Sequence, residues 1–164
     1  MRTVAQLVSY ELPLTTVFFL ASLASASFNY SWVWEGSTAH PLGAQLLPAL
    51  PVFLVSALAE TSRTPFDLPE AESELVAGFI TEMSSTPFVL YFLAEYSSLA
   101  FLSLITGILF FPSDLYPLTV ALLILLAVWV RATLPRLRYD QLMSVGWNVL
   151  LPLSVMLTVI ILAT

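Results

Sequence analysis

Five long apolar segments limit what this chain can fold into. An α-helix rises about 1.5 Å per residue, so roughly 20 residues cross the hydrocarbon core of a bilayer. The second segment is short and contains Pro48 and Pro51, so we expect a kink or a partly unwound turn there. The sequence predicts one membrane domain over residues 1–164, an all-α polytopic bundle with spans at about 7–27, 42–59, 86–111, 116–134 and 142–163.

Composition excludes several other classes. The chain is 59% hydrophobic and 10% charged, whereas a soluble domain carries about 25% charged residues. It has no Cys and one His, which excludes a disulfide framework and a thiolate metal site and disfavours a His-based one. A net charge of −6 with five basic residues, all Arg, argues against a nucleic-acid partner.

The arginines predict an orientation. With five spans, all of them fall on the side of the N-terminus, the 60–85 loop and the 131–141 loop: Arg2, Arg63, Arg131, Arg136 and Arg138. An excess of Arg marks the cytoplasmic side, or the matrix side in a mitochondrion, so the C-terminus is expected on the opposite side. The last three are by default membrane anchors. Asp140 lies two residues after Arg138 and Asp67 lies four residues after Arg63, so ion pairs are possible.

The loop "RTPFDLPEAESELVAGF" concentrates acidic residues. One reading is helix-start chemistry, because Asp67 and Glu70 have capping-box spacing, and acids near a helix N-terminus are favoured by the helix dipole. This reading predicts a short helix within the 60–85 loop. It explains Glu72 and Glu74 less well.

Four other acids, Glu11, Glu60, Glu82 and Glu95, lie in or at the ends of apolar spans. A carboxylate deep in a bilayer costs at least ~2.5–3.5 kcal/mol and usually faces a bundle interior or a hydrated cavity. For any one of them, a carboxyl held permanently neutral by burial is an alternative. Together they predict a proton or cation path. The aromatic residues that flank the loop, Phe66, Phe79 and Phe88, would either line an apolar cavity or pack in the core.

The stretches "RTVAQLVSYELPL", "LAETSRTPFDLPEAESELVAGF", "FLAEY" and "RATLPRLRYDQLM" resemble membrane subunit 1 of respiratory complex I, the proton-pumping NADH:ubiquinone oxidoreductase. The resemblance spans nearly the whole chain and implies that its five spans match the family's fourth to eighth helices. We therefore expect a fragment of a split subunit, with a separately encoded N-terminal fragment. The motif "FDLPEAESELVAG" resembles the mitochondrial members of this family. This resemblance implies a location in the mitochondrial inner membrane, with a bacterial plasma membrane as the alternative.

The resemblance also implies residue roles. The carboxylates that would transfer protons are Glu11, Glu60, Asp67, Glu70, Glu72, Glu74, Glu82 and Glu95. The residues that would lie at the ubiquinone cavity are Arg63, Phe66, Asp67, Phe79, Phe88, Arg131, Arg136, Arg138 and Asp140. The chain departs from the family at Met83, where a Tyr is common, so the hydrogen bonding near Glu82 is expected to differ.

The chain carries no flavin or iron–sulfur motif, so the resemblance implies a coupling subunit that is not catalytic alone. Ubiquinone would be the substrate, with FMN, iron–sulfur clusters and NADH bound by partner subunits. The expected partners are the missing fragment, the hydrophilic subunits at the quinone site, small membrane subunits and lipid. Two alternatives stay open: a subunit of an energy-converting hydrogenase or antiporter-type complex without quinone, and a non-catalytic scaffold.

Overall fold

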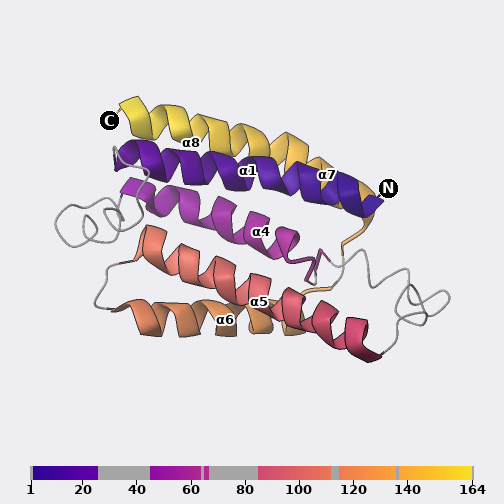
Figure 1. Ribbon diagram of the computed structural model, residues 1–164. Helices are drawn as coiled ribbons and strands as arrows, with labels where there is room; N and C mark the ends of the chain where they lie inside the picture. Colours follow the sequence, from indigo (N-terminus) through magenta and orange to yellow (C-terminus); the bar gives the residue numbers. More distant parts are fainter. Residues whose placement is uncertain are drawn as a thin grey trace.

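The computed structural model describes residues 2–25, 45–63, 65–66, 85–111, 115–135 and 137–163. Figure 1 shows these residues as helices that lie side by side and alternate in direction. In chain order they are α1 (Arg2–Ala24), the 3₁₀ turn η1 (Leu47–Ala49), α4 (Leu50–Glu60), α5 (Ser85–Phe110), α6 (Tyr116–Thr133), α7 (Tyr139–Val145), the π-helical segment η4 (Gly146–Leu150) and α8 (Leu151–Ala163). The all-α prediction is confirmed, since no strand occurs among these described ranges.

Four helical stretches are long and apolar enough to cross a membrane: Val4–Ala24, Thr86–Phe110, Tyr116–Thr133 and Tyr139–Ile161. The stretch from Leu47 to Glu60 is apolar but shorter. Its main helix, α4, has 11 residues and is therefore about 17 Å long at 1.5 Å per residue. The expected irregularity at the prolines is present, because the 3₁₀ turn η1 contains Pro48 and α4 begins directly after it, with Pro51 in its first turn. A fifth complete span stays a prediction.

The hydrophobic core lies where α1 packs against α4 and α8. Phe53 of α4 is fully buried at its centre and contacts the rings of Phe18 at 5.3 Å and Phe110 at 5.7 Å between centroids. On the other side of α4, α5 pairs with α6. Gly107 permits this close approach, because a Cβ there would lie 3.0 Å from side-chain carbons of both Tyr116 and Val120.

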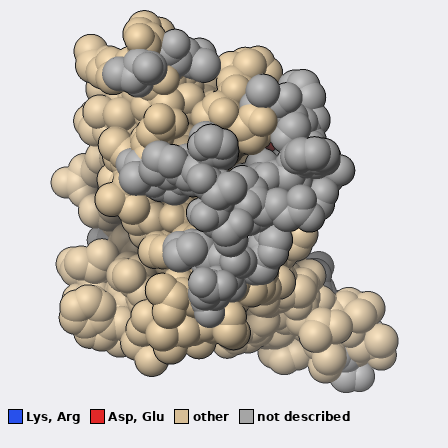
Figure 2. Space-filling view, turned by 90° about the vertical axis from the view of Figure 1, so that its left-hand side faces the viewer, with Lys and Arg blue, Asp and Glu red and all other residues tan. Residues whose placement is uncertain are grey.

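The four arginines of the described chain lie at one end of the bundle. Arg2 begins α1, Arg63 follows α4, Arg131 lies in the last turn of α6 and Arg138 precedes α7, and Figure 1 places all these points at the N-terminal end. Figure 2 views the opposite end and shows no Lys or Arg among the residues described there. The helices alternate in direction, and these four positions lie at the same end of the bundle.

Candidate functional site

Residues 61–63 and 65–66, here called the Arg63 turn, leave the C-terminus of α4. The Phe66 N–H donates to the carbonyl of Arg63 at 2.7 Å, which closes the turn. Ser62 has φ 51°, in the left-handed region. This conformation costs a residue with a side chain on the order of 1–2 kcal/mol, so surrounding contacts must hold the turn in place.

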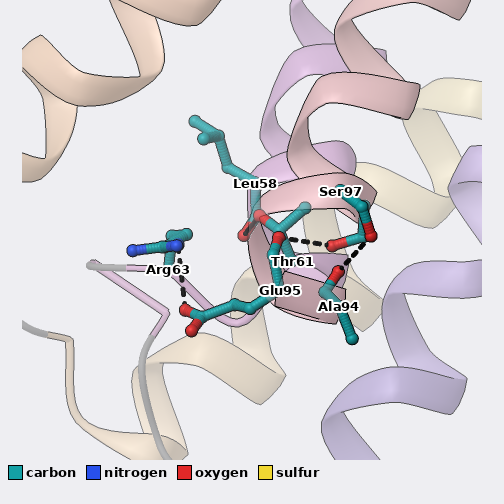
Figure 3. Close-up of polar contacts among 7 residues, drawn as sticks. Leu58, Thr61, Arg63, Ala94, Glu95 and Ser97 are labelled. Atoms are coloured by element: carbon teal, nitrogen blue, oxygen red, sulfur yellow. Dashed lines mark hydrogen bonds and ion pairs between the residues drawn. The ribbon is translucent and has the colours of Figure 1, made fainter. Parts of the chain in front are cut away.

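Arg63 is buried although it follows directly from a helix end, with 5% of its surface exposed. Its Nε lies 2.9 Å from Oε1 of Glu95 in α5, and Figure 3 shows the two side chains directed toward one another. The atoms are close enough for an ion pair, but the N–H direction does not meet hydrogen-bond geometry. The guanidinium carbon also lies 4.3 Å from the centre of the Tyr96 ring, which is within cation–π range.

Arg131 joins this group from the last turn of α6. Its guanidinium and that of Arg63 both interact with the hydroxyl of Tyr96. The structure thus brings together Arg63, Glu95 and Arg131, which were predicted as site residues from three separate parts of the sequence. Tyr96 was not predicted as a site residue.

Two polar side chains of α1 fasten the Arg63 turn from the other side. The amide Nε2 of Gln6 donates to the carbonyls of Ala59 at 3.2 Å and Phe66 at 2.8 Å. The Tyr10 ring packs against Phe66 in a tilted arrangement with ring centroids 5.5 Å apart, and its hydroxyl donates to the carbonyl of Leu142 at 2.8 Å. The sequence prediction missed Gln6, because a single neutral amide near the start of an apolar span gives no distinct signal.

Glu60 interacts electrostatically with Glu11 of α1. Glu60 is half-buried at the end of α4, one residue past the predicted span, and its Oε2 has no hydrogen-bond partner among the described residues. Burial, and secondly the charge of Glu11, raise the pKa of Glu60. Such a carboxyl can exchange a proton nearer to neutral pH than an exposed one.

Other predicted site residues lie elsewhere. The predicted ion pair between Arg138 and Asp140 is present at 3.1 Å, but its side chains are 80% and 71% exposed in this chain. Phe66 packs in the core, whereas Phe88 is exposed and contacts Phe92 at 4.8 Å between centroids. Seven residues fall outside the described ranges: Asp67, Glu70, Glu72, Glu74, Phe79, Glu82 and Arg136.

The arrangement suits proton transfer. Two carboxyls, Glu60 and Glu95, flank a turn that carries a buried cation, and Glu11 adds a negative charge within reach of Glu60. A proton gained by one carboxyl changes the electrostatic balance of the others, because charges interact strongly in a partly buried site. Among the described residues, no group of three or more His, Cys, Asp or Glu could hold a metal ion.

The family model and the relatives that match this chain all describe the same type of protein. The family model described as NADH dehydrogenase matches residues 1–162. The H subunit of NADH-quinone oxidoreductase from Rhodospirillum centenum is 46% identical over 170 residues, covering 94% of this chain and 51% of the relative. NADH-ubiquinone oxidoreductase chain 1 of Mycosarcoma maydis is 42% identical over 180 residues, covering 98% of this chain and 54% of the relative. The chain thus spans about half the length of the curated relatives it matches.

Proposed function

This chain belongs to the NADH dehydrogenase family of subunit 1 proteins, and we propose from that membership that it is a membrane subunit of a proton-pumping NADH:ubiquinone oxidoreductase. Its part would be to help form the ubiquinone chamber and to carry carboxylates that couple quinone reduction to proton movement. The observation that carries this proposal is the Arg63 turn, where a buried Arg63–Glu95 ion pair lies beside the partly buried Glu60.

The proposed mechanism begins with a change of charge when a quinone is reduced. Arg63 would transmit that change, because its guanidinium balances the charge of Glu95 at 2.9 Å. Glu60 would take up a proton and exchange it with Glu11, whose charge already acts on it. This path would be extended toward the quinone by the acids outside the described ranges: Asp67, Glu70, Glu72, Glu74 and Glu82. Seven other residues would lie toward the quinone chamber: Phe66, Phe79, Phe88, Arg131, Arg136, Arg138 and Asp140.

The electrons would come from partner subunits. NADH, FMN and iron–sulfur clusters would be bound there, and the protein around a cofactor supplies orientation and electrostatics to chemistry that the cofactor performs. The chain spans about half the length of these relatives, and the helices that correspond to their other half would complete the site. Hydrophilic subunits at the quinone site, small membrane subunits and lipid would complete the surroundings.

The proposed location is the mitochondrial inner membrane, with the N-terminus and the 60–85 loop in the matrix. The apolar helices and the family both support a membrane, and the arginines at one end of the bundle support the orientation. The thiol introduced by Ser73→Cys in this Cys-free chain should react with a membrane-impermeant reagent added from the matrix side. Labelling of the Ser73→Cys variant only from the opposite side would contradict the orientation.

Purification tests the function itself. A tagged copy of this chain, extracted in mild detergent, should bring down an assembly that reduces ubiquinone with NADH, and depletion of the chain should remove that activity. An assembly that translocates protons but reduces no quinone would instead favour the antiporter-type alternative. An assembly that keeps full activity after depletion of this chain would leave only a scaffold role.

A further inference from the structure

Gln6 is one of the most completely buried polar residues of the described chain, with 1% of its surface exposed. It lies in the first turns of α1, and its amide bonds to Ala59 and Phe66, which are far away in sequence. Ala59 comes just before the Arg63 turn and Phe66 ends it. One side chain therefore joins the two ends of the segment that carries Arg63.

A neutral carboxamide can make both bonds. Its NH₂ group has two N–H donors, whereas an ionised carboxylate has none and an apolar side chain has none. The last carbonyls of a helix such as α4, including that of Ala59, have no N–H partner within the helix and accept donors from outside it. At Ala59 the Gln6 amide adds to the N–H of Ser62, which donates to the same carbonyl at 3.2 Å.

These bonds act on the residue with the unfavourable backbone. Ser62 has φ 51° and lies between the two carbonyls that Gln6 holds. Arg63 follows Ser62, so a turn that relaxed at Ser62 would move the guanidinium away from Glu95, now 2.9 Å away. The N–H of Leu137 adds a second fastening, since it donates to the carbonyl of Pro65 at 3.0 Å.

We propose that Gln6 is a positioning residue for proton transfer: its amide holds the Arg63 turn closed and thereby keeps Arg63 in place against Glu95. The role of this contact in proton transfer rests on the proposed function, whereas the hydrogen bonds from Gln6 to the turn do not. The Oε1 atom of Gln6 is buried and has no hydrogen-bond partner among the described residues.

The test compares Gln6→Leu, Gln6→Asn and Ser56→Ala in the assembled complex. Gln6→Leu removes both donors and keeps a similar size, while Gln6→Asn keeps the amide on a shorter side chain. Ser56→Ala is the matched control, because Ser56 is fully buried and bonds only to carbonyls of its own helix. Hydrogen exchange of the Phe66 amide reports on the turn, and quinone reduction per assembled complex reports on its use.

We expect Gln6→Leu to accelerate exchange at Phe66 and to lower turnover by about tenfold, since small misplacements at a reacting site cost up to about 10²-fold. The apparent KM for a short-chain ubiquinone should stay the same, and the pH profile of turnover should shift because the Arg63–Glu95 pair is loosened. In both exchange at Phe66 and turnover, Gln6→Asn should lie between Gln6→Leu and the wild type, and Ser56→Ala should match the wild type.

Several results would overturn the proposal. Unchanged exchange at Phe66 in Gln6→Leu would show that the amide does not hold the turn. Faster exchange with normal turnover and a normal pH profile would show a purely structural bond. If Gln6→Leu fails to assemble, Gln6→Asn decides by the same two readouts. If the wild-type assembly reduces no quinone, the proposed function is wrong, and the exchange result still decides whether Gln6 holds the turn.

Discussion

Replacing Arg63 with Leu is expected to lower the stability of the assembled protein by about 3–5 kcal/mol, because it leaves the Glu95 carboxylate in a buried site without its close cation. Arg63 and Glu95 have side chains that are 6% and 12% exposed. The measurements are the content of assembled complex on native gels and the midpoint of its thermal inactivation. Both should fall sharply in Arg63→Leu.

Arg138→Leu is the matched control, since it removes the same cation from a pair that is 80% and 71% exposed. An exposed pair contributes less than about 1 kcal/mol, so the assembled content should stay near that of the wild type. Adding Glu95→Gln to Arg63→Leu should recover part of the loss, because no carboxylate then remains unbalanced. Equal losses in Arg63→Leu and Arg138→Leu would contradict the buried ion pair.

Glu60→Gln is expected to depress quinone reduction by at least about tenfold, since a positioned acid–base group contributes roughly 10²–10⁴-fold. Gln keeps the size and hydrogen bonding of Glu60 but cannot release a proton near neutral pH. The loss of local stability should be at most about 1 kcal/mol, as for a typical hydrogen bond. Quinone reduction by NADH, measured per assembled complex in membranes, checks this result.

Electron transfer from NADH to an artificial acceptor should be unaffected in Glu60→Gln, because that step is proposed to take place in partner subunits. The matched control is Glu35→Gln, the same chemical change in the loop predicted on the other side of the membrane. It should leave quinone reduction unchanged. If Glu60 only ends a helix, the two variants would behave alike, with activity near that of the wild type.

The helices could be predicted from sequence because their cause is local. Long apolar runs form helices in a membrane, where every backbone polar group must be satisfied within the segment. Four helical stretches of the described chain are long and apolar enough to cross a membrane. The irregular start of the second segment also followed from local chemistry, since Pro48 and Pro51 lack backbone N–H groups.

The contacts of the candidate site could be predicted only in part. Arg63 was expected on the charged side, where a nearby acid such as Asp67 was the natural partner in sequence. Its observed partner is Glu95, on another helix, and the burial of both depends on how α4 and α5 pack. Sequence distance does not reveal which distant charges meet. Arg138 and Asp140 were predictable as a pair because they are near neighbours in the chain.

Gln6 shows the same limit from another direction. Its importance lies in two bonds to backbone carbonyls of Ala59 and Phe66. Every residue has a backbone carbonyl group, so the sequence does not indicate which carbonyls will accept a hydrogen bond from a given side-chain amide. Ser62 has a left-handed backbone conformation just after the end of α4, and this explains why a donor from α1 is needed to hold the turn.

Proton pumping in sealed vesicles tests the central claim most directly, with Glu60→Gln and Glu95→Gln compared with the wild type at equal content of assembled complex. The carboxylates of this chain are proposed to couple quinone reduction to proton movement. Both variants should therefore lose quinone reduction and pumping together, while NADH oxidation by an artificial acceptor continues at the wild-type rate. Quinone reduction and pumping near wild-type rates in both variants would contradict the account.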